Sequence, residues 1–98
     1  MVTVMTPEEE VVRAGQAKEI LEHQLFREAV AAIEQALLSG IHRSAFTEEK
    51  LREKLCQRYA ILQDLVGQLK SHMETGQLAE ETIRRRTVAE RIKAVVNW

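Results

Sequence analysis

The chain has 98 residues and a formal net charge of −1, with 30% charged and 45% hydrophobic residues. It has one proline and four glycines, while its many Ala, Leu, Glu, Gln, Arg and Lys residues favour helix, which excludes a strand-rich fold. The near-zero charge excludes long-range attraction of the whole molecule to DNA or to an anionic membrane. We predict an all-α fold in one domain: an antiparallel helical hairpin with a kinked first helix and a short C-terminal helix, forming an oligomeric helical bundle.

The first predicted helix begins at a capping box. Residues 1–5 are expected to be loose, Thr6 is the N-cap, Pro7 occupies the first helical position, and Glu9 stands three residues after the cap. The opening residues are too short for a signal peptide, and no apolar run approaches about 18 residues. We therefore expect the protein in the cytoplasm in which it is made, or in a particle assembled there, and not in a membrane.

The first helical segment is predicted over residues 7–39, with Gly40 in the left-handed position that often follows a helix. Its apolar stripe changes midway, because Lys18 and Glu22 fall on the apolar face of the second half if the helix is continued straight back. We therefore predict a kink near residues 22–24 that divides the segment into two helices.

The second long helix is predicted over residues 47–75. Thr47 is its expected N-cap, Phe46 and Leu51 fit a hydrophobic staple, and Gly76 is expected to end it. The short connection before it favours an antiparallel return. Gly67, inside the helix, predicts a close crossing with another helix, since glycine costs about 1 kcal/mol relative to alanine there.

This helix carries a heptad seam, in which apolar residues alternate steps of four and three. Neighbouring apolar residues widen the face beyond what a two-stranded coiled coil needs, so we predict that the seam mediates self-association. The seam consists of Leu55, Tyr59, Leu62, Val66, Leu69 and Met73.

The C-terminal arm, residues 79–98, is predicted to end in a short helix that starts at a second capping box, Thr87 with Glu90. Its apolar stripe is too short to be stable alone and must dock on something. Two alternatives stay open: the arm folds back on its own hairpin, or it inserts into another subunit or a partner protein. The partner-binding residues would be Val88, Ile92, Val95 and Trp98.

No residue pattern predicts catalysis, a cofactor or a metal site. The three histidines lie far apart, and Cys56 is the only cysteine, so zinc-ligand spacing is absent and Cys56 is interpreted as a small, reduced hydrophobic residue. No glycine-rich phosphate loop is present. The acidic run Glu8 to Glu10 is explained by its place at a helix N-terminus. We therefore predict no enzymatic activity and no small-molecule substrate.

The only basic concentration is Arg84, Arg85 and Arg86, followed by Arg91 and Lys93. Residues 79–98 contain five basic and three acidic side chains, a local charge of +2. Nucleic-acid-binding surfaces usually carry a stronger patch with nearby aromatic or amide side chains. We favour a solvated face, or ion pairs with an acidic neighbouring subunit; the alternative is DNA binding through the three consecutive arginines.

Three runs carry a resemblance to a known group of proteins: AKEILEHQLFREA at 17–29, REKL at 52–55 and LKSHMETGQLA at 69–79. They are close to an L-x-x-x-x-F-x-x-A step, an R-E-x-L helix start and an E-T-G-K-L-A turn, which here reads E-T-G-Q-L-A. Over residues 14–80 the chain thus resembles short α-helical proteins of tailed phages and prophages. It departs from them at Gln24, where a proline often stands, and from Thr82 onward. The resemblance implies a phage protein made with the head and packaging genes.

The leading hypothesis is a non-enzymatic phage structural or assembly protein that acts by helix-mediated self-association. One alternative is a DNA-binding packaging or regulatory subunit that uses Arg84 to Arg86. Another is a small inhibitor that binds a host enzyme through an exposed helix face. The expected partners are further copies of the chain, and another phage or host protein is a further option.

Overall fold

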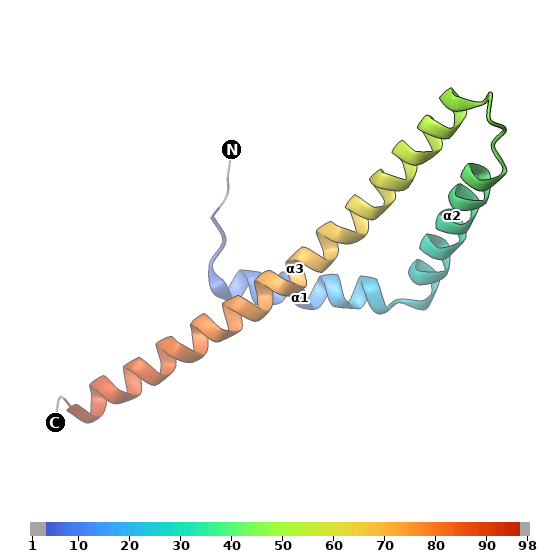
Figure 1. Ribbon diagram of the computed structural model, residues 1–98. Coiled ribbons are helices and arrows are strands. Elements are labelled where there is room, and N and C mark those ends of the chain that lie inside the picture. The colour runs from blue at the N-terminus through green and yellow to red at the C-terminus, as the bar shows by residue number, and fades with distance from the viewer. Residues whose placement is uncertain (1–3, 97–98) are drawn as a thin grey trace. The chain divides into compact units, whose positions relative to one another are not determined.

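The computed structural model describes residues 4–96, which form three helices and no strand (Figure 1). The helices are α1 (Pro7–Glu22), α2 (Gln24–Arg43) and α3 (Glu49–Val96). This confirms the predicted all-α class. The chain divides into two compact units: one spans Glu19–Gln68, and the other combines the described parts of Met1–Lys18 and Leu69–Trp98.

Helix α1 begins as its capping signal predicts. The Glu9 backbone N–H donates to Thr6 Oγ1 at 3.2 Å, and the Glu10 N–H donates to the Thr6 carbonyl at 3.0 Å. Three glutamates in the first turn place negative charge at the positive end of the helix dipole.

The boundary between α1 and α2 is His23, which lies inside the interval 22–24 predicted for the kink. Its backbone is extended, with φ −65° and ψ 122°. The His23 N–H donates to the Ile20 carbonyl at 3.2 Å, and the His23 carbonyl accepts from the Arg27 N–H at 3.0 Å. These two bonds end one helix and start the next, so no proline is needed to break the segment.

The predicted helix end at Gly40 is wrong, because α2 continues to Arg43 and no described glycine has a positive φ. The end is made instead by Ser44, whose hydroxyl donates to the Ile41 carbonyl at 2.7 Å and whose N–H donates to the same oxygen at 3.3 Å. Gly40 is useful for its small size: a Cβ atom there would lie 3.0 Å from Leu55 Cδ1.

The connection between α2 and α3 is held by polar contacts rather than by the predicted staple. Phe46 is 96% exposed, so it makes no staple with Leu51. Glu48, not Thr47, takes the N-cap position, because its carbonyl accepts the Arg52 N–H at 3.1 Å and its carboxylate accepts the Ala45 N–H at 2.9 Å.

Arg52, a residue of α3, also stabilises the connection between α2 and α3. Its Nε donates to Ser44 Oγ at 2.9 Å, and its Nη2 donates to the Ala45 carbonyl at 2.7 Å. One guanidinium group thus joins the end of α2 to the first turn of α3.

Helix α3 runs without interruption for 48 residues, so the predicted helix end at Gly76 and the predicted start at Thr87 are both wrong. The Thr87 hydroxyl donates to the carbonyl of Ile83, four residues earlier, at 3.0 Å. Thr82 makes the same kind of bond to Leu78 at 3.0 Å. These hydroxyls therefore bond back along the helix instead of capping a new one.

Few hydrophobic residues are buried among those described: Ala17 and Ala79 in one unit, Leu37 and Leu62 in the other. A Cβ atom on Gly76 would overlap Ala14 Cβ, so α1 and α3 cross closely at small residues. The crossing predicted at Gly67 is wrong, because nothing lies within 4 Å of a Cβ atom built there.

Candidate association surfaces

The predicted heptad seam of α3 is partly covered by its own chain. Leu62 is only 8% exposed, and the other five seam residues are half-buried. None of the six seam residues is therefore fully exposed. That the seam mediates self-association stays a prediction.

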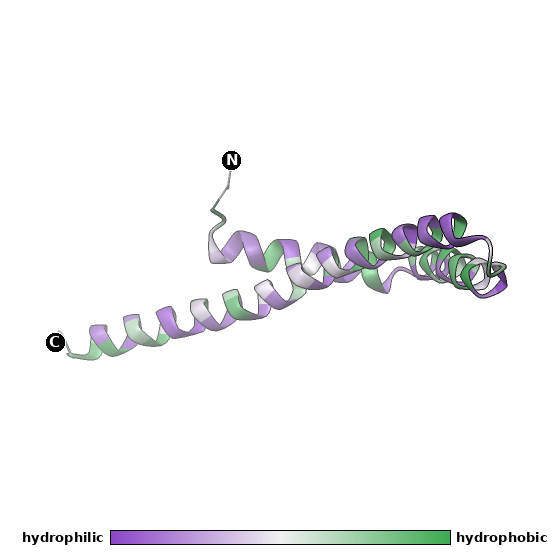
Figure 2. Cartoon of the chain, turned by 45° about the horizontal axis from the view of Figure 1, so that its top comes forward, coloured by the Kyte–Doolittle hydropathy of each residue, from purple (hydrophilic) through white to green (hydrophobic). Residues whose placement is uncertain are grey.

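Large hydrophobic side chains are exposed elsewhere on all three helices, and Figure 2 shows hydrophobic and hydrophilic segments alternating along them. On α1 the most exposed is Val12, and on α2 Leu25 and Ile33 are more than half exposed. On α3 they include Ile61, Leu65 and Leu78, followed by Val88, Ile92, Val95 and Val96.

The C-terminal arm does not fold back on its own chain over its described end, because every residue from 84 to 96 is exposed. Ile92 is 58% and Val95 70% exposed. Trp98, which we predicted as part of this surface, lies outside the described residues. The apolar stripe of the arm therefore faces solvent.

A shallow surface hollow accompanies this stripe. It is lined by residues of α3 alone, so it is an open surface feature and not an enclosed pocket. The lining residues are Glu81, Arg84, Arg85, Val88, Ala89 and Ile92. The hollow combines apolar side chains with two arginines.

The three consecutive arginines each pair with a carboxylate. Glu81 accepts from Arg84 at 3.0 Å and from Arg85 at 3.2 Å within the same helix. Arg86 Nη1 donates to Glu8 Oε1 at 2.9 Å, which joins α3 to the start of α1. All three ion pairs lie within one chain, whereas we predicted a solvated face or ion pairs with an acidic neighbouring subunit. DNA binding by this run stays an alternative prediction.

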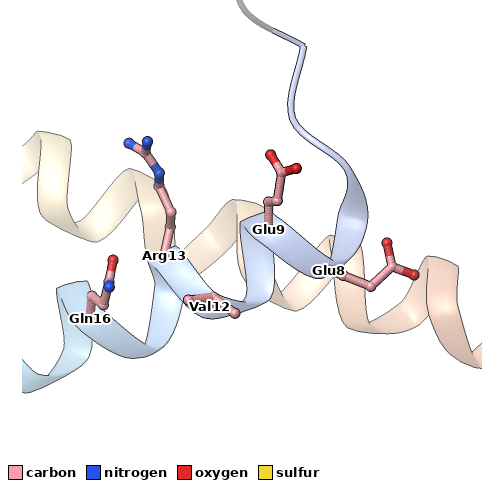
Figure 3. A pocket seen from close by; sticks show the side chains of 5 residues that line it. All are labelled: Glu8, Glu9, Val12, Arg13 and Gln16. Carbon is pink, nitrogen blue, oxygen red and sulfur yellow. The ribbon is translucent and has the colours of Figure 1, made fainter.

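A second surface hollow lies on α1, where Glu8, Glu9, Val12, Arg13 and Gln16 line it (Figure 3). Figure 3 shows Glu9 and Arg13 projecting from α1, with α3 behind the helix. Val12 is 61% exposed at its centre. This hollow also belongs to one helix, and its side chains do not converge on a common point.

Potential metal ligands do not cluster within residues 4–96. No group of three or more His, Cys, Asp or Glu residues there is placed to hold a metal ion. Cys56 is exposed. In the same part of the chain, no helix has both the length and the apolar character of a membrane span.

Two structural contacts were missed by reasoning from sequence. The pairs Ala14 with Ala17 and Gly76 with Ala79 each place small residues three positions apart, a spacing that could have indicated the crossing of α1 and α3. The Arg86 to Glu8 pair joins residues 78 positions apart and has no local sequence signal.

No family model, curated protein or solved structure matched this chain.

Proposed function

We propose that this protein is a non-enzymatic structural or assembly component that acts by self-association through its helices. The observation that supports this most directly is the imbalance between its core and its surface. The buried hydrophobic residues described are two alanines and two leucines, while large apolar side chains remain exposed on every helix.

This imbalance has a thermodynamic consequence. Burial contributes about 25 cal/mol per Å² of apolar surface, so exposed apolar stripes forgo stabilisation that contact with another chain would supply. A helix as long as α3 also needs packing along its length, because helical propensity alone stabilises it weakly. Self-association covers these surfaces with residues that the chain already contains.

The biological setting that we propose is the assembly of a tailed phage. This part of the proposal is supported only by the sequence resemblance over residues 14–80. Mass spectrometry of purified particles tests it: peptides of this chain in the particle support a virion component, and their absence from particles of a producing strain argues against it.

Self-association itself is tested by sedimentation velocity of the full chain across the micromolar concentration range. We expect the weight-average mass to exceed that of one chain, 11.2 kDa, and to rise with concentration. A strict monomer throughout this range would overturn the proposal.

A further inference from the structure

We propose that the exposed basic end of α3 in one copy, residues 84–96, docks on the outer face of α1 in a second copy. This inference rests on the proposed self-association and specifies which surfaces meet. The two surfaces are the hollows described above, one centred on Val88 and Ile92 and the other on Val12.

The charges of the two helices decide which partner fits. Residues 81–96, which include the lining of the hollow, contain four arginines and one lysine against two glutamates, a local charge of +3, and the three consecutive arginines are also paired with Glu81 and Glu8 of the same chain. Helix α1 contains five glutamates against one arginine and one lysine, a local charge of −3. The basic ends of two copies would repel one another, whereas the basic end of one copy and α1 of another attract. Complementary potentials of this kind select the partner and its orientation.

The apolar stripe of residues 84–96 faces away from α1 of its own chain. Arg86 marks the side of α3 that faces α1, through its ion pair with Glu8. Successive helical residues are about 100° apart, so Val88 lies about 160° and Val95 about 180° around the helix from Arg86. The stripe therefore needs a second chain to cover it.

The acceptor surface on α1 is likewise turned outward. Ala14 and Ala17 lie on the side of α1 that is packed or buried, and Val12 lies about 160° around the helix from Ala14. Glu9 and Gln16 accompany Val12 on this outer face. Val12 and the apolar stripe thus point away from one another, while Glu8, at the edge of the acceptor hollow, is paired with Arg86 of the same chain.

Because Val12 and the apolar stripe point away from one another, two copies cannot exchange both contacts at once, and the contact is heterologous. Heterologous contacts repeat from copy to copy until they close a ring or extend as a filament. The inference therefore predicts species larger than a dimer at high concentration, with association that weakens as salt screens the charges.

The test is a charge exchange in the full chain. Glu9→Lys and Arg91→Glu are each expected to weaken association at least about tenfold, because each places like charges opposite one another. The double variant restores the complementary pattern and has the net charge of the parent chain, so it is expected to recover most of the association. Recovery also shows that the single variants had not simply failed to fold.

Two further variants act as controls. Lys93→Glu makes the same charge change as Arg91→Glu, but it lies about 200° around the helix from Arg91, and it is expected to weaken association less. Ile92→Ala removes exposed apolar surface while favouring helix, so association should fall several-fold with no loss of helical circular dichroism.

Sedimentation velocity of all variants separates the outcomes. If the parent chain associates but the charge reversals have no effect, or the double variant does not recover, this inference is overturned while self-association stands. If the parent chain is a monomer, both proposals fail.

Discussion

Gly76 of α3 lies directly against Ala14 of α1, and a Cβ atom on Gly76 would overlap the Ala14 Cβ atom. The Glu10 carbonyl oxygen would lie 3.4 Å from the same Cβ atom. This contact gives the two helices their closest approach among the glycine positions described. Substitution of Gly76 and of Gly67, both in α3, is therefore expected to change stability in different directions.

Replacing Gly76 with alanine is expected to lower the free energy of unfolding by about 1–3 kcal/mol, because the added methyl group forces two helix backbones apart. The matched control is Gly67→Ala in the same helix, where the added Cβ atom meets nothing within 4 Å. This control should gain about 1 kcal/mol from the higher helix propensity of alanine. Urea unfolding at one fixed protein concentration measures both, since association contributes to apparent stability.

The opposite signs of these two substitutions are the essential result. If Gly76→Ala stabilises the protein as much as Gly67→Ala, then α1 does not cross α3 at this glycine in solution.

The ion pair between Arg86 and Glu8 is expected to contribute modestly. Both side chains are about half exposed, and pairs of this kind typically contribute about 0.2–1 kcal/mol. A double-mutant cycle with Arg86→Ala and Glu8→Gln should give a coupling free energy in this range at low salt, and less at high salt. A coupling of zero at low salt would contradict the expected contribution of this ion pair to stability.

Arg52 is expected to contribute more to the free energy of unfolding than an ordinary surface arginine does. Arg52→Ala removes two hydrogen bonds at the connection and should lower the free energy of unfolding by about 1–2 kcal/mol. Arg52→Lys should restore only part of this loss, because an ammonium group cannot reproduce the geometry of the guanidinium. Lys54→Ala, at an exposed position of the same helix, serves as the control and should change stability little.

The measurement for Arg52 is again chemical denaturation at fixed concentration. Equal stability of the alanine variant and the parent chain would mean that the connection is not held by this side chain.

His23 offers a site for stabilisation. It occupies the N-cap position of α2 but makes no side-chain capping hydrogen bond. Aspartate is a preferred N-cap residue, so His23→Asp should raise stability by about 0.5–1 kcal/mol, less the smaller cost of a negative charge after the end of α1 at Glu22. His42→Asp makes the same chemical change in the last turn of α2, where the helix dipole disfavours negative charge, and should lower stability by about 0.3–1 kcal/mol.

Thermal unfolding followed by circular dichroism compares these two variants. A loss of stability in His23→Asp similar to that in His42→Asp would contradict the expected capping of α2 by an aspartate at residue 23.

Local signals in the sequence predicted the structure correctly where interactions between neighbouring residues determine the backbone conformation. Composition predicted the all-helical class, the Thr6 and Pro7 signal predicted the start of α1, and the misplaced Lys18 and Glu22 predicted a break near His23. Each depends on interactions within about four residues, such as the bonds from His23 to Ile20 and from Arg27 to His23.

Only the tertiary structure decided which glycines end a helix and which allow two helices to cross. Gly40 and Gly76 look like helix ends in sequence, yet both stay helical because another helix packs against them, at Leu55 and Ala14 respectively. Their backbone conformation thus depends on residues 15 and 62 positions away in the chain. The sequence by itself determined where helices can start and what their surfaces carry, while packing between distant segments decided where α3 continues and which apolar faces remain exposed.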